Sequence, residues 1–207
     1  MASAQSQTDI CNSALSRLGA ATIINMTDNS REARACAVQY DSNRRSELRN
    51  RSWNFAVKRA VLAPDVTAPA FEYKYAFTLP ADYLRLIWPM NDPYLDWKLE
   101  GEKILTNTFQ SPYLGAGYQL PGATGPMLMV KYVADIEDPG LFDPMFYDLL
   151  CITLAIDICE VLTQSNTKKQ ALMAEAKEKL DAAAKAKCFE AAPQEPPDDT
   201  WWLVRNG

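Results

Sequence analysis

The chain has 207 residues, with 21 lysines and arginines against 26 aspartates and glutamates, which gives a formal net charge of −5. Apolar residues make up 48 % and charged residues 23 %, values that argue against a disordered or collagen-like chain. The sequence contains no histidine, which excludes a Ser-His-Asp triad, a Cys-His pair and any histidine-ligated zinc or haem site. An enzyme built from this chain would have to use carboxylates, lysine, tyrosine or cysteine.

Residues 1–60 are predicted to form two helices. Thr8 or Ser6 can cap the first helix, and Gly19 stands where the glycine after a helix C-terminus belongs. The inner face of this helix is expected to carry Ile10, Ala14 and Leu18.

The second helix is predicted from Asn29, which resembles a capping box with Glu32, to about Ser52. At the helical period its apolar residues share one broad arc. They are Ala33, Cys36, Ala37, Tyr40 and Leu48. A narrower arc holds the arginine row, which we define as Arg31, Arg34, Arg45 and Arg49. We expect this row to bind a partner, and a protein rather than DNA because the chain as a whole is acidic.

Residues 57–133 change to a β pattern. Alternating large apolar side chains predict a half-buried strand formed by Phe71, Tyr73, Tyr75, Phe77 and Leu79. Shorter strands are predicted at residues 84–88 and 127–133. The segment 97–105 is typical of a hairpin with Gly101 in its turn. Residues 110–126 are rich in glycine and proline and predict a long loop of the kind that often carries function.

Helices return near the C-terminus. Asp143 is a good N-cap and Pro144 a good first helical residue for a helix that runs to about Thr163. A second helix is predicted at residues 166–187. Residues 188–207 contain three prolines and are predicted to form an extended arm.

No pattern typical of a membrane or secreted protein is present. The first nine residues lack the basic and apolar regions of a signal peptide, so we expect none. The most apolar stretch, residues 145–162, contains Asp148, Asp157 and Glu160. These charges favour a buried core helix over a membrane span.

The cysteines are five in number, and no two are spaced as Cys-x-x-Cys. They are Cys11, Cys36, Cys151, Cys159 and Cys188. The odd count favours reduced, mostly buried thiols over a disulfide scaffold or a cysteine-ligated zinc. We therefore expect no metal and no cofactor.

The order of elements predicts an α+β fold. Residues 1–60 and 134–187 are expected to form a mainly antiparallel helical bundle, residues 61–133 an inserted antiparallel β-rich lobe, and residues 188–207 the extended C-terminal arm. Charge is uneven along the chain: +4 over residues 1–60, −3 over 61–130 and −6 over 131–207.

Several segments, taken together and in order, resemble one family. They are ICNSALSRLG at 10–19, EARACAVQY at 32–40, RRSELRNRSWNFAVKR at 44–59, YAFTLPADYLRL at 75–86, WKLEGEKILTN at 97–107 and FDPMFYDLLCITLAIDICEVLTQS at 142–165. The set resembles the tail tubular protein A family of podoviruses, the head-to-tail adaptors of short-tailed phages. The resemblance covers nearly the whole chain and is weakest in the loop 108–126 and the C-terminal arm.

This resemblance implies a structural virion protein and not an enzyme. Members of the family form a ring of twelve copies at the head-tail junction, made in the host cytoplasm and assembled beneath the portal protein. The other face of the ring holds the tail nozzle protein, and DNA passes through the lumen without sequence-specific binding. The family fold, a helical bundle with a β-lobe, agrees with the order of elements derived above.

Three sets of residues are candidates for the contacts that such a ring needs. The arginine row is the candidate for the contact between subunits, because a ring joins one face of a protomer to a different face of the next. The tip of the arm is the candidate for portal binding: Trp201, Trp202, Leu203 and Arg205. The long loop is the candidate for nozzle binding: Tyr113, Leu114 and Tyr118.

Two other classes of function stay open at this stage. A muralytic hydrolase that cuts cell-wall glycan during entry would need a carboxylate of raised pKa in a cleft, and Glu100 and Glu102 beside the predicted hairpin turn are the candidates. A DNA-binding protein would use the basic helix at residues 31–51.

Overall fold

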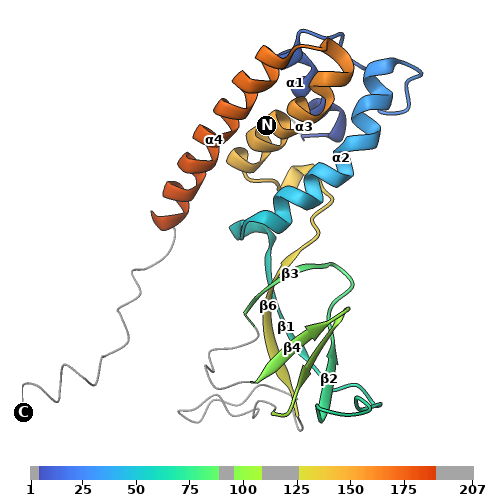
Figure 1. Ribbon diagram of the computed structural model, residues 1–207, viewed down its shortest axis with the longest axis vertical. Coiled ribbons are helices and arrows are strands. Elements are labelled where there is room, and N and C mark those ends of the chain that lie inside the picture. The colour runs from blue at the N-terminus through green and yellow to red at the C-terminus, as the bar shows by residue number, and fades with distance from the viewer. Residues whose placement is uncertain (1–4, 89–95, 109–125, 190–207) are drawn as a thin grey trace, which may run out of the picture.

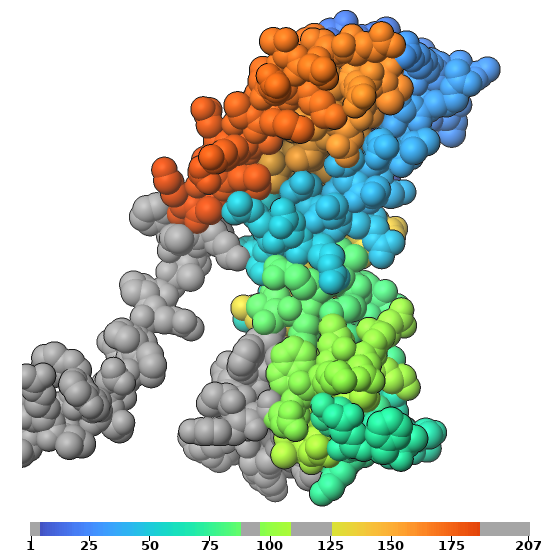
Figure 2. All heavy atoms as spheres, viewed as in Figure 1, coloured from blue at the N-terminus to red at the C-terminus, as the bar shows by residue number. Residues whose placement is uncertain are grey.

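The computed structural model describes residues 5–88, 96–108 and 126–189. Within these residues the protein has the predicted α+β class, with helices at one end of an elongated molecule and strands at the other (Figure 1). The helices are α1 (Gln7–Leu18), α2 (Arg31–Asn50), α3 (Pro144–Thr163) and α4 (Asn166–Phe189), with 3-10 turns η1 (Asn54–Ala56) and η2 (Pro139–Leu141). The C-terminal part of α2, cyan in Figure 2, lies directly against the β end.

The ends of α1 and α3 follow the local rules that the sequence suggests. Ser6 and Asp9 form a capping box on α1: the Asp9 N–H donates to Ser6 Oγ at 3.1 Å and the Ser6 N–H donates to Asp9 Oδ2 at 3.0 Å. Gly19 ends α1 in the left-handed conformation, with φ at 68°. Asp143 caps α3 by accepting from the Met145 N–H at 2.7 Å.

The predicted cap of α2 is wrong by one residue. Ser30, not Asn29, is the N-cap, and its hydroxyl accepts from the Ala33 N–H at 3.1 Å. A serine hydroxyl serves this position as well as an asparagine carboxamide does, and Ser30 stands at the required three-residue spacing from Ala33. The helix also ends at Asn50, two residues earlier than predicted.

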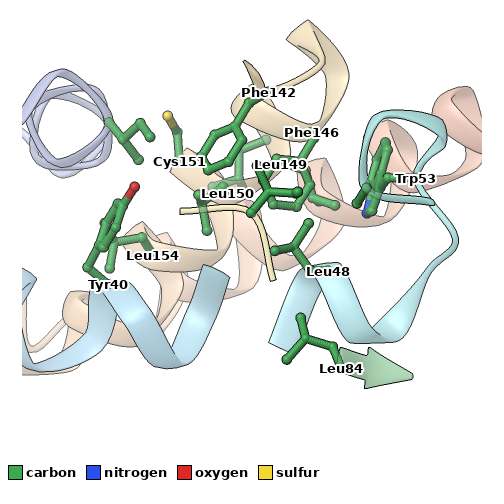
Figure 3. Packing of buried hydrophobic residues seen from close by; sticks show 14 of the residues in the cluster. Tyr40, Leu48, Trp53, Leu84, Phe142, Phe146, Leu149, Leu150, Cys151 and Leu154 are labelled. Carbon is green, nitrogen blue, oxygen red and sulfur yellow. The ribbon is translucent and has the colours of Figure 1, made fainter. Parts of the chain in front are cut away.

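Helix α3 is the centre of the helical end, because α1, α2 and α4 all pack against it. Its apolar sequence is buried on most sides, as a central helix requires. Figure 3 shows Tyr40 and Leu48 of α2 facing Leu149, Leu150 and Leu154 of α3. All five side chains are buried, so the contact between α2 and α3 is a tightly packed part of the core.

The described strands form two antiparallel sheets of three strands each. The strands are β1 (Val57–Leu62), β2 (Tyr75–Thr78), β3 (Tyr83–Trp88), β4 (Trp97–Glu100), β5 (Lys103–Thr106) and β6 (Leu128–Ala134). One sheet has the order β1-β6-β3 and the other the order β2-β5-β4. Chain connections run from α2 through η1 into β1 and from β6 towards α3, so two crossings link the helical end to the β end (Figure 1).

Two of the strand predictions need correction. Strand β1 was not expected, because VKRAVL mixes charged and apolar residues without strict alternation. The strand predicted from Phe71 begins only at Tyr75, and Phe71 is 80 % exposed. The cause is Glu72, whose φ of 71° lies in the left-handed region and interrupts an extended strand. The predicted hairpin forms as β4 and β5, with Gly101 at a φ of 58°.

None of the helices in the described part of the chain is long and apolar enough to cross a membrane.

Candidate interaction surfaces

The arginine row does not form one free surface. Arg31 Nη2 donates to the Val161 carbonyl, and Arg49 Nη1 donates to the Leu84 carbonyl. Arg45 Nε lies 3.3 Å from Asp135 Oδ2. Arg34 is exposed, and its side chain has no hydrogen bond or ion pair within the described residues.

Arg44, which the sequence prediction missed, is the most deeply buried arginine of α2. Only 3 % of it is exposed, and its Nη1 donates both to Asp135 Oδ1 and, at 2.8 Å, to the Ile136 carbonyl. A signal was present in the sequence, since Arg44 follows Tyr40 by four residues and precedes Leu48 by four. This spacing places it on the buried face of the helix. A buried guanidinium needs a partner of opposite charge, and Asp135 supplies it.

Together these bonds form a junction between the two ends of the molecule. We use the word junction for Arg44, Arg45 and Arg49 with Asp135 and the carbonyls of Ile136 and Leu84. Leu84 belongs to β3, while Asp135 and Ile136 follow β6 directly. The C-terminal half of α2 is thereby bonded to strand β3 and to the segment that directly follows the neighbouring strand β6. The junction is a structural connection and has little capacity left for an outside ligand.

Asp82 extends the junction into the sheet. Its carbonyl accepts from the Asp135 N–H at 2.7 Å, and its carboxylate accepts from Lys58 Nζ at 2.7 Å and from the Tyr132 hydroxyl at 3.0 Å. Burial raises the pKa of Asp82, but the hydrogen bonds from Lys58 and Tyr132 outweigh burial and hold the pKa below its usual value. The ionised form of Asp82 therefore stabilises the fold.

The other half of α2 borders a groove against α3. The groove has a volume of about 310 Å³, and we define it by Arg31, Arg34, Val38 and Val161. Val38 is 75 % exposed and Val161 is 52 % exposed, although both are apolar. Arginines beside exposed apolar side chains are a composition typical of protein–protein contacts. The Arg34 side chain has no partner in the described part of the chain. The two arginines at the groove, Arg31 and Arg34, are therefore better placed to bind another protein than Arg45 and Arg49 are.

The candidate catalytic carboxylates do not form a cleft pair. Glu100 and Glu102 are both exposed at the β4–β5 hairpin, and Glu100 lies 2.8 Å from Lys98 Nζ. A glycosidase acid needs an apolar, water-poor setting, which this hairpin does not provide.

The basic helix is also a poor surface for DNA. Four of its arginines, Arg31, Arg44, Arg45 and Arg49, bond to carbonyl or carboxylate oxygens of their own chain. An arginine that is already bonded in this way is less available to a phosphate, which lowers the expected gain from counterion release.

Cys11, Cys36, Cys151 and Cys159 are buried and are free thiols. A hydrogen bond with Cys36 and burial raise the pKa of Cys11, and burial raises the pKa of Cys151 to about 12. Both thiols are protonated at neutral pH and are not poised as nucleophiles. Within the described residues, no group of three or more cysteine, aspartate or glutamate side chains is arranged to hold a metal ion.

Two sets of candidates lie outside the described residues. They are the loop residues Tyr113, Leu114 and Tyr118, and the arm residues Trp201, Trp202, Leu203 and Arg205. Their proposed contacts with nozzle and portal stay predictions.

A scan against protein-family models finds no match for this chain, and a search of curated proteins finds none either. The functional proposal below is based on the groove, the junction and the pattern of sequence segments.

Proposed function

We propose that this chain is a structural virion protein of a short-tailed phage: a head-to-tail adaptor that forms a ring between the portal and the tail nozzle and conducts DNA. The observation that carries the proposal is the groove, where Arg34, Val38 and Val161 are exposed side by side on a body that is braced by its junction. A subunit of a ring needs one such face for its neighbour and a rigid frame behind it.

The neighbouring subunit has to bring acidic and apolar groups to the groove. Between Tyr132 and Thr167 the chain has seven acids and no lysine or arginine. Asp135 is already bonded within the junction, whereas Glu137 and Asp138 are exposed. We therefore propose that the segment after β6 of one subunit meets Arg31 and Arg34 of the next. This narrows the interface from four arginines to the two that line the groove, of which Arg31 uses one of its five N–H donors on the Val161 carbonyl.

The two ends of the molecule suit different partners. In this proposal the helices from residues 1–60 and 134–187 act as one bundle, and the strands between them act as an inserted lobe. The lobe, with the loop 110–126, faces the nozzle, and the arm from Cys188 docks into the portal. The net charge of −5 suits a lumen that lets DNA pass, because basic contacts would hold the phosphates.

Electron microscopy of the chain mixed with the portal protein of the same virus tests the proposal. We expect a second ring attached to the tail-side face of each portal. Bare portals after mixing would contradict it. A zymogram in which the purified chain clears cell-wall glycan, with the clearing lost in Glu100→Gln, would favour the hydrolase instead.

A further inference from the structure

A second hollow lies where the end of α2, the start of α3 and the last turns of α4 meet. Its volume is about 370 Å³, within the range of about 300–1,000 Å³ that is common for binding pockets. Trp53, Phe55 and Met145 form an apolar part of its lining. We call this hollow the α4 pocket. It is separate from the groove, which lies between the N-terminal half of α2 and α3.

The α4 pocket is open because α4 presents only small side chains to it. Ala183, Ala184 and Ala186 line that wall, and methyl groups are too short to reach the opposite side. The opposite wall is fixed, since Trp53 packs edge-on against Phe146 with ring centroids 5.3 Å apart. The space therefore fits a flat apolar group that arrives from elsewhere.

The α4 pocket also carries positive charge. Arg51 and Arg85 both line it, and the Arg85 Nη2 donates to Ser52 Oγ at 2.8 Å. The Arg85 Nε is buried and has no hydrogen-bond partner within the described residues. Asp143 is the acid of the lining, and its carboxylate is already used to cap α3. A carboxylate from an incoming segment would supply the acceptor that the Arg85 Nε lacks.

The segment that follows α4 has the matching composition and starts beside the pocket. Ala184 lies five residues before the end of α4, a distance of about 8 Å along a helix. Beyond Phe189, residues 190–200 can span roughly 36 Å when extended, so Trp201 can reach back with length to spare. Asp198 and Asp199 come directly before Trp201 and Trp202, an order of acids and then aromatics.

We propose that the α4 pocket is the intramolecular binding site of the chain's own C-terminal segment. An indole of Trp201 or Trp202 packs between Trp53 and the alanines of α4, and the carboxylates of Asp198 and Asp199 face Arg51 and Arg85. Two adjacent exposed tryptophans favour aggregation unless they are covered, and this site covers them in the free subunit. One consequence rests on the proposed function: the portal would have to compete with the pocket for the same segment.

A photo-cross-link in the full chain tests this proposal. Leu203→p-benzoylphenylalanine places a cross-linker beside both tryptophans and leaves them intact. After irradiation of dilute protein, we expect monomeric products joined to residues 51–55, to Met145 or to residues 183–186, as mapped by mass spectrometry. Products joined only to other surfaces would overturn the proposal. Covalent dimers joined at the pocket would overturn it as well, because they would show a segment from a second copy.

A matched pair of variants controls the test. Ala184→Trp fills the pocket from α4 and should lower the pocket cross-link several-fold, whereas Ala182→Trp, exposed and absent from the lining, should leave it unchanged. Equal cross-linking in both variants would contradict the proposal.

The double variant Asp198→Asn with Asp199→Asn should also lower the yield of the pocket cross-link. Added salt should lower that yield less in this variant than in the parent chain. None of these measurements uses the portal protein. This proposal can therefore fail while the adaptor proposal holds, and the adaptor proposal can fail while this one holds.

Discussion

The arginines in the two halves of α2 have different surroundings. In the C-terminal half, Arg44, Arg45 and Arg49 bond to oxygens of β3 and of the segment after β6. In the N-terminal half, Arg31 bonds to a carbonyl of the neighbouring helix α3, while the Arg34 side chain has no partner within the described residues and lies beside exposed valines. The difference comes from the strands, which bring carbonyls and a carboxylate only to the C-terminal half. A row of like charges on a helix therefore does not define one surface until the tertiary partners are known.

Removing the buried arginine should have the largest effect. Arg44→Met keeps an unbranched apolar stem but removes the guanidinium, which leaves the Ile136 carbonyl without its donor and the Asp135 carboxylate with only the weaker contact to Arg45. We expect a loss of about 3 kcal/mol in the free energy of unfolding, measured by urea denaturation.

The matched control for Arg44→Met is Asp41→Asn. Asp41 is the exposed partner of Arg44, with Oδ1 at 3.6 Å from Nε and its side chain 75 % exposed. Its removal should change the stability by less than about 1 kcal/mol. A cost for Arg44→Met no larger than that of Asp41→Asn would show that the junction does not brace the molecule.

A smaller effect, with a distinct pH dependence, is expected at Asp82. Asp82→Asn should cost about 1 kcal/mol at neutral pH, because it weakens the hydrogen bonds from Lys58 and Tyr132. The folded-state pKa is lowered, so the contribution of the carboxylate is present above the unfolded-state pKa of about 3.9 and is lost as the pH falls through the folded-state pKa. Urea denaturation across this range should show the variant and the parent converging at acid pH. A constant difference down to pH 2 would contradict this assignment.

The smallest effect on stability, and a large one on assembly, is expected in the groove. Arg34→Glu should change the free energy of unfolding by no more than about 0.5 kcal/mol, since its side chain is exposed. The same change should weaken co-sedimentation with portal rings. Arg59→Glu is the control, because Arg59 is also exposed but lies on β1, away from the groove. Equal binding by both variants would remove the groove from the interface.

Local rules predict much of this fold from the sequence. The Ser6 cap, Gly19, the Asp143-Pro144 start of α3 and the hairpin turn at Gly101 each depend on residues a few positions apart, and each is confirmed. The errors arise where two local signals compete: Ser30 against Asn29 at the cap of α2, and the left-handed Glu72 within an alternating pattern.

The interaction surfaces were harder to predict because they depend on distant segments. Arg44 and Asp135 are 91 residues apart, and nothing near either one signals the other. The groove exists only because α3 packs beside α2, and the α4 pocket exists only because the last turns of α4 carry alanines opposite Trp53. The helical period places Arg44 on the buried face of α2. A charged residue at such a position is rarely predicted to be buried, because arginine is almost never fully buried unless it is paired.

Light scattering coupled to size-exclusion chromatography tests the central claim most directly. The chain is measured alone, with the portal protein of the same virus, and as Arg34→Glu with the same portal. The adaptor proposal predicts that the parent chain adds the mass of a full ring to each portal and that Arg34→Glu adds far less. A portal peak whose mass does not change on addition of the parent chain would contradict the account.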